Sequence, residues 1–278
     1  MFVLVSDYDG TFKTRIHDLK INIREIKKFR ERGNIFAIAT GRPFSSIEKE
    51  INKHGIELDF LACNDGAAIF DDKLNQVKAH YLTPEQLTFI SSLLGEYPNL
   101  SLGRFFSPKE IFKNSITEPI EIEIIKEPGT SFKPFISNLQ LTYPSLHYFK
   151  AGKSLFIKGN VTKSTAVAEI TNCLNFEVPK KHIYTIGDEL NDIEMIRDYN
   201  GVRMFEAHPR LWLATPKFVF EEHHLVKYLN FRSKKASKWC SYNLWKLLCP
   251  FISFFMPAGC GKATVKILSS MLMTTPSP

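Results

Sequence analysis

The chain has 278 residues, of which 44% are hydrophobic and 23% charged, and its formal net charge is +7. This length permits one large domain or two smaller ones, and the composition can supply a core, which excludes a disordered chain. Five scattered cysteines without a C-x-x-C pair argue against a disulfide framework and a zinc site. Because an apolar run stands at residue 2 in place of a signal peptide, we expect a cytoplasmic protein.

The opening of the chain carries its most informative pattern. Residues 2–5 (FVLV) predict a buried parallel strand, and residues 7–11 (DYDGT) follow where that strand ends. Ligands bind at that edge of an open α/β sheet. The paired carboxylates of Asp7 and Asp9 can hold a divalent cation, and one of them can attack an electrophile. A surface loop with two acidic residues is the alternative.

A second predicted strand and a later helix start add groups that suit a phosphate. Residues 35–39 (IFAIA) predict the strand, and Thr40 and Gly41 follow it with a hydroxyl and with backbone N–H groups for an anion. Lys163 lies at the start of a helical pattern over residues 162–170, where the helix dipole disfavours a cation. That position makes Lys163 a candidate functional cation, with a solvated surface lysine as the alternative.

A third predicted strand, at residues 183–187 (IYTIG), is followed by further acidic and amide groups. Asp188 follows it directly and is placed to join Asp7 as a metal ligand. Asn191 and Asp192 come next, before a predicted helix. They suit either the same site or a helix cap.

Taken in order, these segments resemble the motifs of the haloacid dehalogenase-like (HAD) hydrolases, and their spacing resembles that of the Cof-type phosphatases. The four matching segments are residues 7–11, residues 40–42, Lys163 and residues 187–192. The resemblance covers the chain up to the start of its basic tail. It implies an α/β fold, with a Rossmann-like core around a parallel sheet and a smaller α+β cap domain inserted between the second and third motifs.

The same resemblance implies Mg²⁺-dependent hydrolysis of a phosphate monoester through an aspartyl-phosphate. Asp7 would be the nucleophile, and Asp9 would act as general acid and then as general base. The metal would be bound by Asp7, the backbone carbonyl of Asp9 and Asp188, with Asp192 orienting that shell. The phosphate would be held by Thr40, Lys163, Asn191 and the backbone N–H groups of Tyr8 and Gly41.

The chain departs from the family pattern at several positions near these motifs. Asp65 stands in the run NDGA where the family often has asparagine directly before Gly-Ala. Glu189 replaces a frequently small residue, and Ser164 follows Lys163 where glycine is usual. Because no catalytic group is lost, we expect these changes to affect substrate preference more than catalysis.

We expect a discontinuous catalytic core of residues 1–66 and 152–222, with a cap domain of residues 67–151 between its two parts. Two helices of the core are predicted at residues 23–32 and 46–54, each with a capping signal near its start and a glycine after its end. The alternation of strands and helices favours a parallel sheet.

The predicted cap contains an alternating run at residues 120–124 (IEIEI), which favours a sheet with one solvent-exposed face. Such a cap would exclude water from the site and choose the leaving group. Arg104, Phe105 and Phe106 are candidate specificity residues, with plain packing as the alternative.

Residues 223–278 form a basic and aromatic tail. They contain eight of the 36 Lys and Arg residues and none of the 29 acids, so their formal charge is +8 against −1 for residues 1–222. Lysines interleaved with Trp, Tyr and Phe suit the surface of an anionic membrane. The uncharged run at residues 247–261 is too short to span a bilayer. A helix docked on the core or on a second subunit is the alternative, and no base-reading motif favours nucleic acid.

Three functions are compatible with these observations. The first is a phosphatase acting on a small phosphorylated metabolite such as a sugar phosphate. The second is a phosphatase or phosphotransferase that the tail brings to the inner face of a membrane, where it acts on a lipid-linked or envelope-precursor phosphate. The third is a non-catalytic binding protein on the same fold, against which the complete motif set argues. The sequence names neither the substrate nor the oligomeric state.

Overall fold

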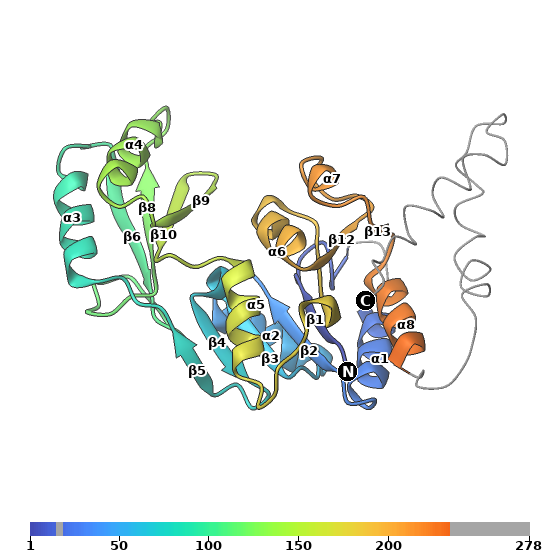
Figure 1. The fold of residues 1–278 in the computed structure, drawn as a ribbon. Coiled ribbons are helices and arrows are strands. Elements are labelled where there is room, and N and C mark those ends of the chain that lie inside the picture. Colours follow the sequence, from blue (N-terminus) through green and yellow to red (C-terminus); the bar gives the residue numbers. More distant parts are fainter. Residues whose placement is uncertain (15–18, 234–278) are drawn as a thin grey trace, which may run out of the picture. The chain divides into compact units, whose positions relative to one another are not determined.

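A computed structural model describes residues 1–14 and 19–233 of the chain (Figure 1). Within these residues the strands form one eight-stranded and one five-stranded sheet. The larger sheet has the order β13 (Phe218–Val219), β12 (Asn200–Met204), β11 (Ile183–Gly187), β1 (Val3–Ser6), β2 (Ile35–Ala39), β3 (Phe60–Cys63), β4 (Ala68–Asp71) and β5 (Gln76–Ala79). Its strands from β13 to β3 are parallel, which confirms the predicted α/β class.

The central strand β1 brings the predicted motifs together. Its four residues are buried, as expected for an uncharged strand covered on both faces. Val3 pairs in parallel with Ile183 of β11 on one side and with Ile35 of β2 on the other. The three strands therefore end at the same edge of the sheet, and the segments that follow them meet there.

The smaller sheet is antiparallel and has the order β7 (Ile111–Phe112), β6 (Leu100–Phe106), β8 (Glu121–Lys126), β10 (Ser154–Lys158) and β9 (His147–Ala151). The helices α3 (Pro84–Leu94) and α4 (Lys133–Thr142) lie on one side of it (Figure 1). Their contact is apolar and includes Ile90, Leu93, Ile122, Ile124, Phe135, Leu139, Leu155 and Ile157. This unit lies between the second and third motifs, where the resemblance predicted a cap.

The strand pairing corrects the expected domain bounds at residues 67 and 152. β4 turns back antiparallel onto β3, and β5 pairs with β4, so the larger sheet continues to Ala79. β10 pairs with β8 and β9, so the smaller sheet continues to Lys158. The bound expected at residue 67 therefore coincides with a reversal of chain direction within the larger sheet and not with the passage to the smaller one.

The prediction that one face of the alternating run in β8 is exposed to solvent is wrong. Glu121 and Glu123 are only 5% and 4% exposed. Glu123 accepts hydrogen bonds from Arg104 Nε at 2.5 Å and from Ser154 Oγ at 2.6 Å. Glu121 accepts one from Asn64 Nδ2 at 3.0 Å. The alternation is genuine, but polar partners from neighbouring segments bury the second face.

Six further helices accompany the larger sheet: α1 (Leu19–Arg30), α2 (Phe44–His54), α5 (Lys163–Asn172), α6 (Ile193–Asp198), α7 (Leu211–Ala214) and α8 (Glu222–Ser233). The helices predicted at 23–32 and 46–54 are α1 and α2 with shifted ends. Gly55 ends α2 in the left-handed region, at φ 61°, as a C-terminal glycine does. Among the described helices, none has the length and apolar character needed to cross a membrane.

The start of the predicted tail belongs to the core. Helix α8 packs beside α1 (Figure 1), and Arg32 Nη1 donates a hydrogen bond to the Asn230 carbonyl at 2.8 Å. The backbone N–H of His223 donates to Asn22 Oδ1 at 3.1 Å. The expected boundary at residue 223 is therefore too early, because the helix buries Leu225, Val226 and Leu229 in the core. The aromatic part of the predicted tail, from residue 234 onward, lies outside the described residues.

The close approach of β12 to α6 predicts that Gly201 cannot be replaced. A Cβ atom at Gly201 would lie 2.0 Å from the backbone oxygen of Ile196, which can move only with its helix. We expect Gly201→Ala to lower the free energy of unfolding by about 2 kcal/mol or more in urea denaturation. Gly159→Ala is the control, since nothing lies within 4 Å of its added Cβ. Equal unfolding midpoints for both variants would refute the predicted clash.

Candidate active site

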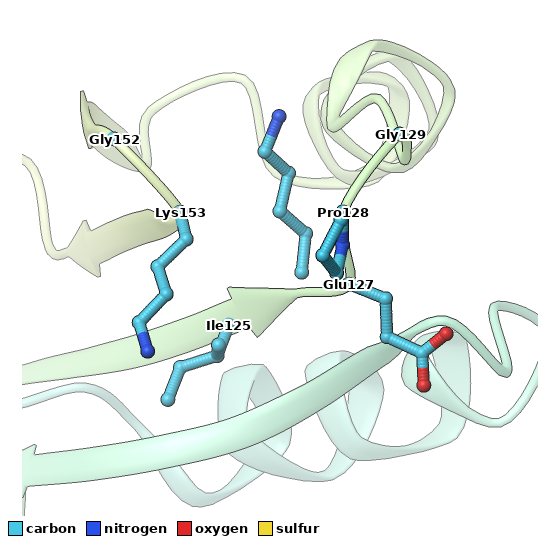
Figure 2. A pocket seen from close by; sticks show the side chains of 7 residues that line it. Ile125, Glu127, Pro128, Gly129, Gly152 and Lys153 are labelled. Carbon is cyan, nitrogen blue, oxygen red and sulfur yellow. The ribbon is translucent and has the colours of Figure 1, made fainter.

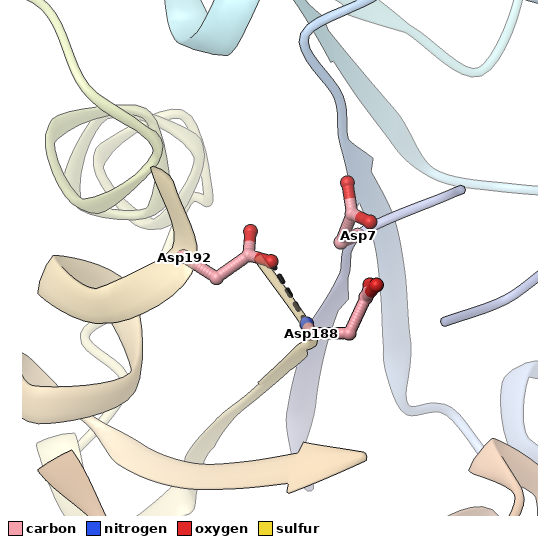
Figure 3. A group of neighbouring side chains, drawn as sticks. All are labelled: Asp7, Asp188 and Asp192. Carbon is pink, nitrogen blue, oxygen red and sulfur yellow. Dashed lines mark hydrogen bonds between the residues drawn. The ribbon is translucent and has the colours of Figure 1, made fainter. Parts of the chain in front are cut away.

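Three carboxylates meet at the edge of the larger sheet where β1 and β11 end. Asp7 follows β1, Asp188 follows β11, and Asp192 lies in the short turn before α6 (Figure 3). One oxygen from each lies within 4.8 Å of the others. Carboxylate oxygens in this number suit a hard divalent cation such as Mg²⁺. The structure thus brings together the three side chains expected at a metal.

Asp192 is the supporting member of this group. It is fully buried, and its Oδ2 accepts the backbone N–H groups of Asp188 and Glu189, both at 2.9 Å. Its Oδ1 accepts a hydrogen bond from Lys163 Nζ at 2.7 Å. Both oxygens are therefore occupied in orienting their neighbours, and the side chain does not cap α6, which was the alternative.

Lys163 is buried among these carboxylates. It is 1% exposed, and its Nζ also donates to Asp7 Oδ1 at 2.6 Å. Thr162 caps α5 by accepting the Thr165 backbone N–H, which fixes Lys163 as the first residue of the helix. Burial alone would lower the pKa of Lys163, but the charges of Asp192 and Asp7 outweigh it and raise the pKa. The alternative of a solvated lysine is excluded.

The charge of the cluster is unbalanced. Burial raises the pKa of Asp7, repulsion from Asp192 and Asp188 adds to this, and Lys163 opposes it. Burial, with repulsion from Asp192, also raises the pKa of Asp188 to about 6. One ammonium faces three carboxylates, and a divalent cation would neutralise the excess. The donor set therefore fits the expected metal.

Gly10 and Thr11 hold the Asp188 carboxylate in place. Gly10 has φ 82°, and a Cβ there would lie 2.1 Å from Asp188 Oδ2. Thr11 Oγ1 donates a hydrogen bond to Asp188 Oδ1 at 2.6 Å. The turn therefore needs glycine both for its left-handed backbone and for the approach of this carboxylate.

The carboxylate of Asp9 is turned toward a different partner. Its side chain is 52% exposed and accepts two hydrogen bonds from Arg42, from Nε at 2.5 Å and Nη2 at 2.6 Å. The guanidinium also lies 5.2 Å from the ring centre of Tyr8. Arg42 belongs to the second motif, directly after Thr40 and Gly41, but nothing in the sequence pairs it with Asp9.

The expected phosphate-binding residues lie at this edge, and the side chains of Tyr8, Thr40, Lys163 and Asn191 all have hydrogen-bond partners within the chain. Thr40 is 1% exposed, at the end of β2. The Tyr8 side chain is buried and donates to Glu50 Oε2 at 2.9 Å, which leaves its backbone as the part available to an anion. Asn191 Nδ2 donates to Asp65 Oδ1 at 2.8 Å. Asp65, noted in the sequence only as a departure from the family pattern, is thus a neighbour of the site.

A hollow of about 470 Å³ lies elsewhere, at the end of the smaller sheet (Figure 2). It is lined by Ile125, Lys126, Glu127, Pro128, Gly129, Gly152 and Lys153. None of these residues belongs to the motif segments, and no carboxylate cluster is present there among the described residues.

Comparisons with known proteins agree with this geometry. The family model of the haloacid dehalogenase-like hydrolases matches residues 4–127 and 105–223. Similar solved structures include haloacid dehalogenase-like hydrolases from Bacteroides thetaiotaomicron and B. subtilis, at 16% and 15% identity and TM-scores of 0.68 and 0.65. The first covers 82% of this chain and 99% of its own, the second 85% and 100%.

A third similar structure is a sugar phosphatase of HAD subclass IIB, at 17% identity and a TM-score of 0.64, covering 84% of this chain and 99% of its own. At these identities the three structures establish the fold. No curated protein matches the chain.

A buried acid lies behind the carboxylate cluster. Glu222, the first residue of α8, is fully buried, and its Oε2 lies 2.9 Å from Ser6 Oγ. Ser6 Oγ is also 2.6 Å from the Asp7 carbonyl oxygen. A hydroxyl has one proton to donate, so a protonated Glu222 can supply the second hydrogen bond. Burial, with repulsion from Glu221, raises the pKa of Glu222 to about 8.

This raised pKa predicts a pH-dependent stability. Between about pH 4.5 and pH 8 the unfolded chain ionises Glu222 while the folded chain keeps the proton, so stability falls as the pH rises, by at most about 1.4 kcal/mol per unit. Glu222→Gln does not titrate and removes this dependence. We expect urea denaturation to favour the variant increasingly from about pH 5 to pH 8. The exposed Glu206→Gln is the control, and a constant difference between wild type and Glu222→Gln would contradict the assignment.

Proposed function

This chain belongs to the haloacid dehalogenase-like hydrolases, and on that premise we propose that it is a Mg²⁺-dependent phosphatase of small phosphorylated metabolites such as sugar phosphates. The observation that carries the proposal is the group of Asp7, Asp188 and Asp192, in which the buried Lys163 donates hydrogen bonds to Asp7 and Asp192. The sugar phosphatase among the similar structures supports the substrate class by analogy.

The metal would be held by Asp7, Asp188 and the backbone carbonyl of Asp9. Bound Mg²⁺ supplies positive charge that offsets the phosphate and the attacking carboxylate. Asp192 keeps Asp188 in place through its backbone N–H at 2.9 Å. The phosphate oxygens are bound by Lys163, Thr40 and Asn191, with the backbone N–H groups of Tyr8 and Gly41.

Asp7 is the nucleophile. Lys163 holds its Oδ1 at 2.6 Å, which orients the carboxylate and reduces its repulsion from a phosphate dianion. A bond forms between a carboxylate oxygen of Asp7 and phosphorus, and the ester bond between phosphorus and the leaving oxygen breaks. Water then cleaves the aspartyl-phosphate and releases inorganic phosphate.

Asp9 transfers the protons of both steps. It protonates the leaving oxygen and later accepts a proton from the attacking water. Arg42 holds its carboxylate through two hydrogen bonds in the described structure. Asp9 therefore exchanges Arg42 for the substrate before the first proton transfer, and the half-exposed position of the pair allows that exchange.

The proposal predicts Mg²⁺-dependent release of phosphate that requires Asp7. On a panel of phosphate monoesters, we expect Asp7→Asn to lower kcat by about 10³-fold or more, because the amide is a poor nucleophile. Asp72→Asn, an exposed acid outside the site, should keep wild-type turnover. Turnover that is equal in Asp7→Asn and wild type, or that is independent of Mg²⁺ after chelation, would overturn the mechanism.

An exposed apolar patch favours a second feature, recruitment to an anionic membrane surface. In this patch the ring centres of Phe205, Phe218 and Phe220 lie within 5.9 Å of one another, around the edge strand β13. The Arg203 guanidinium lies over both Phe218 and Trp212, and Leu213 follows Trp212 in the chain. Leu213 is 90% exposed and Trp212 57%, and the exposed Arg210 and Lys217 flank them. Aromatic and apolar side chains beside cations are typical of a membrane interface.

The sequence after the described core has the matching charge. Residues 234–278 contain six lysines and no acid. Each basic residue near an anionic leaflet contributes about 1 kcal/mol of attraction. The occupant that fits both the patch and this charge is a bilayer with anionic headgroups, which would give the phosphatase access to a lipid-linked or envelope-precursor phosphate.

Co-sedimentation with vesicles tests this feature. We expect the full chain to bind phosphatidylcholine vesicles containing phosphatidylserine, and to bind pure phosphatidylcholine much less. The double variant Trp212→Ala/Leu213→Ser should lose binding by about tenfold, because its apolar contact is removed. Leu141→Ser is the matched control, since Leu141 is 83% exposed on α4 of the smaller sheet. Equal binding of both variants would exclude the patch, and no binding of the full chain would exclude recruitment.

A further inference from the structure

A left-handed turn joins β3 to β4 beside the site. Asn64, Asp65 and Gly66 have φ values of 49°, 55° and 107°. Left-handed backbone is uncommon in residues other than glycine, and two such residues in succession persist only where their surroundings hold them. Asn64 and Asp65 are also buried, at 1% and 8% exposure.

Lys158, the last residue of β10, holds this turn from the smaller sheet. Its Nζ donates to the Asn64 carbonyl at 3.2 Å and to Asp65 Oδ2 at 2.5 Å. A third contact, of 3.5 Å, joins it to Glu121 Oε2 on the paired strand β8. Lys158 is 4% exposed, so one buried ammonium serves both the backbone and the carboxylate of the turn.

The same turn also contacts the segments that are proposed to bind the phosphate. The backbone N–H of Asp65 donates to the Thr40 carbonyl at 2.9 Å. Asp65 Oδ1 accepts a hydrogen bond from Asn191 Nδ2 at 2.8 Å. A Cβ on Gly66 would lie 2.8 Å from Cβ of Ala166, in the helix that begins with Lys163. The second, third and fourth motifs therefore all rest against the turn.

Asp65 also adds a negative charge beside Gly41, one of the residues expected to bind the phosphate. Its Oδ1 lies within 3.2 Å of the position a Cβ of Gly41 would take. Burial alone would raise the pKa of Asp65, but the charges of Lys158 and Lys163 outweigh it and lower the pKa to about 2, so Asp65 is ionised. An unpaired carboxylate beside the Gly41 backbone, which is proposed to bind the phosphate, would repel a phosphate dianion.

We propose that Lys158 is a positioning residue for phosphate binding, which clamps the turn of residues 64–66 and neutralises Asp65. It acts through Asp65 and does not touch the substrate. Lys158 offsets the charge that comes with aspartate at this position, and it ties the substrate-binding edge of the larger sheet to the last strand of the smaller one. The kinetic consequence rests on the proposed function, whereas the effect on the turn does not.

Four variants of the full-length protein with Mg²⁺ test the proposal: Lys158→Met, Asp65→Asn, the double variant, and Lys150→Met on β9 as an exposed control. The probe is inorganic phosphate, with affinity measured by calorimetry and as the inhibition constant against ester hydrolysis. Amide hydrogen exchange of the segment around residues 64–66 is measured in parallel. The split between KM and kcat is taken on the best ester.

We expect Lys158→Met to weaken phosphate about tenfold or more and to raise KM more than it lowers kcat, because Asp65 is left as an unpaired charge. Exchange at the turn should become faster. The double variant should regain phosphate affinity to within about threefold of wild type, since the charge itself has been removed. Lys150→Met should match wild type throughout.

The proposal is overturned if Lys158→Met equals Lys150→Met in phosphate affinity, or if the double variant is as weak as the single one. Should Lys158→Met fail to fold, Asp65→Asn decides: retained or tighter phosphate binding supports neutralisation, and a tenfold loss refutes it. A wild type that neither binds phosphate nor hydrolyses esters overturns the proposed function alone. Hydrogen exchange then decides the clamp, since unchanged exchange in Lys158→Met refutes it and faster exchange supports it.

Discussion

The salt bridges of Lys163 are the interaction on which the candidate site depends. Asp7 and Asp192 stand on segments far apart in the chain, and each lies within 2.7 Å of the same ammonium. Three carboxylates at a buried edge repel one another, and removing one partner of a buried ion pair is strongly destabilising. The parallel register of β1 and β11 brings the acids together, and the positive charge of Lys163 reduces the repulsion between them.

The same arrangement of one lysine between two acids occurs a second time. Lys158 stands between Asp65 and Glu121, five residues before Lys163 in the chain. The two lysines bracket the return of the chain from the smaller sheet to the larger one. The first cluster organises the charge of the chemistry, and the second fixes the turn against which the phosphate-binding segments rest. Because a buried charge at each end of this short connection needs its partners, the two lysines fix where the connection lies.

The smaller sheet shows how polar residues can close a face that its sequence leaves open. Alternating glutamates on β8 would be solvated on an isolated strand. In the fold Glu123 lies between Arg104 and Ser154, and Glu121 between Asn64 and Lys158. These partners come from β6, β10 and the turn after β3, and they satisfy the glutamates on a face that also carries their cross-strand neighbours Phe106 and Phe156.

The sequence by itself determined the α/β class, the family and the residues that meet at the sheet edge. Local signals suffice for these, because buried strands are apolar runs and the residues after parallel strands share one edge. Only the tertiary structure decided which charges are paired. Arg42 with Asp9, Lys158 with Asp65, and Glu222 behind Asp7 are contacts between distant segments, and the periodicity of one segment carries no information about its partner. The sequence did not show that the larger sheet continues to Ala79 and the smaller one to Lys158, because the pairing of strands and not their composition assigns each strand to its sheet.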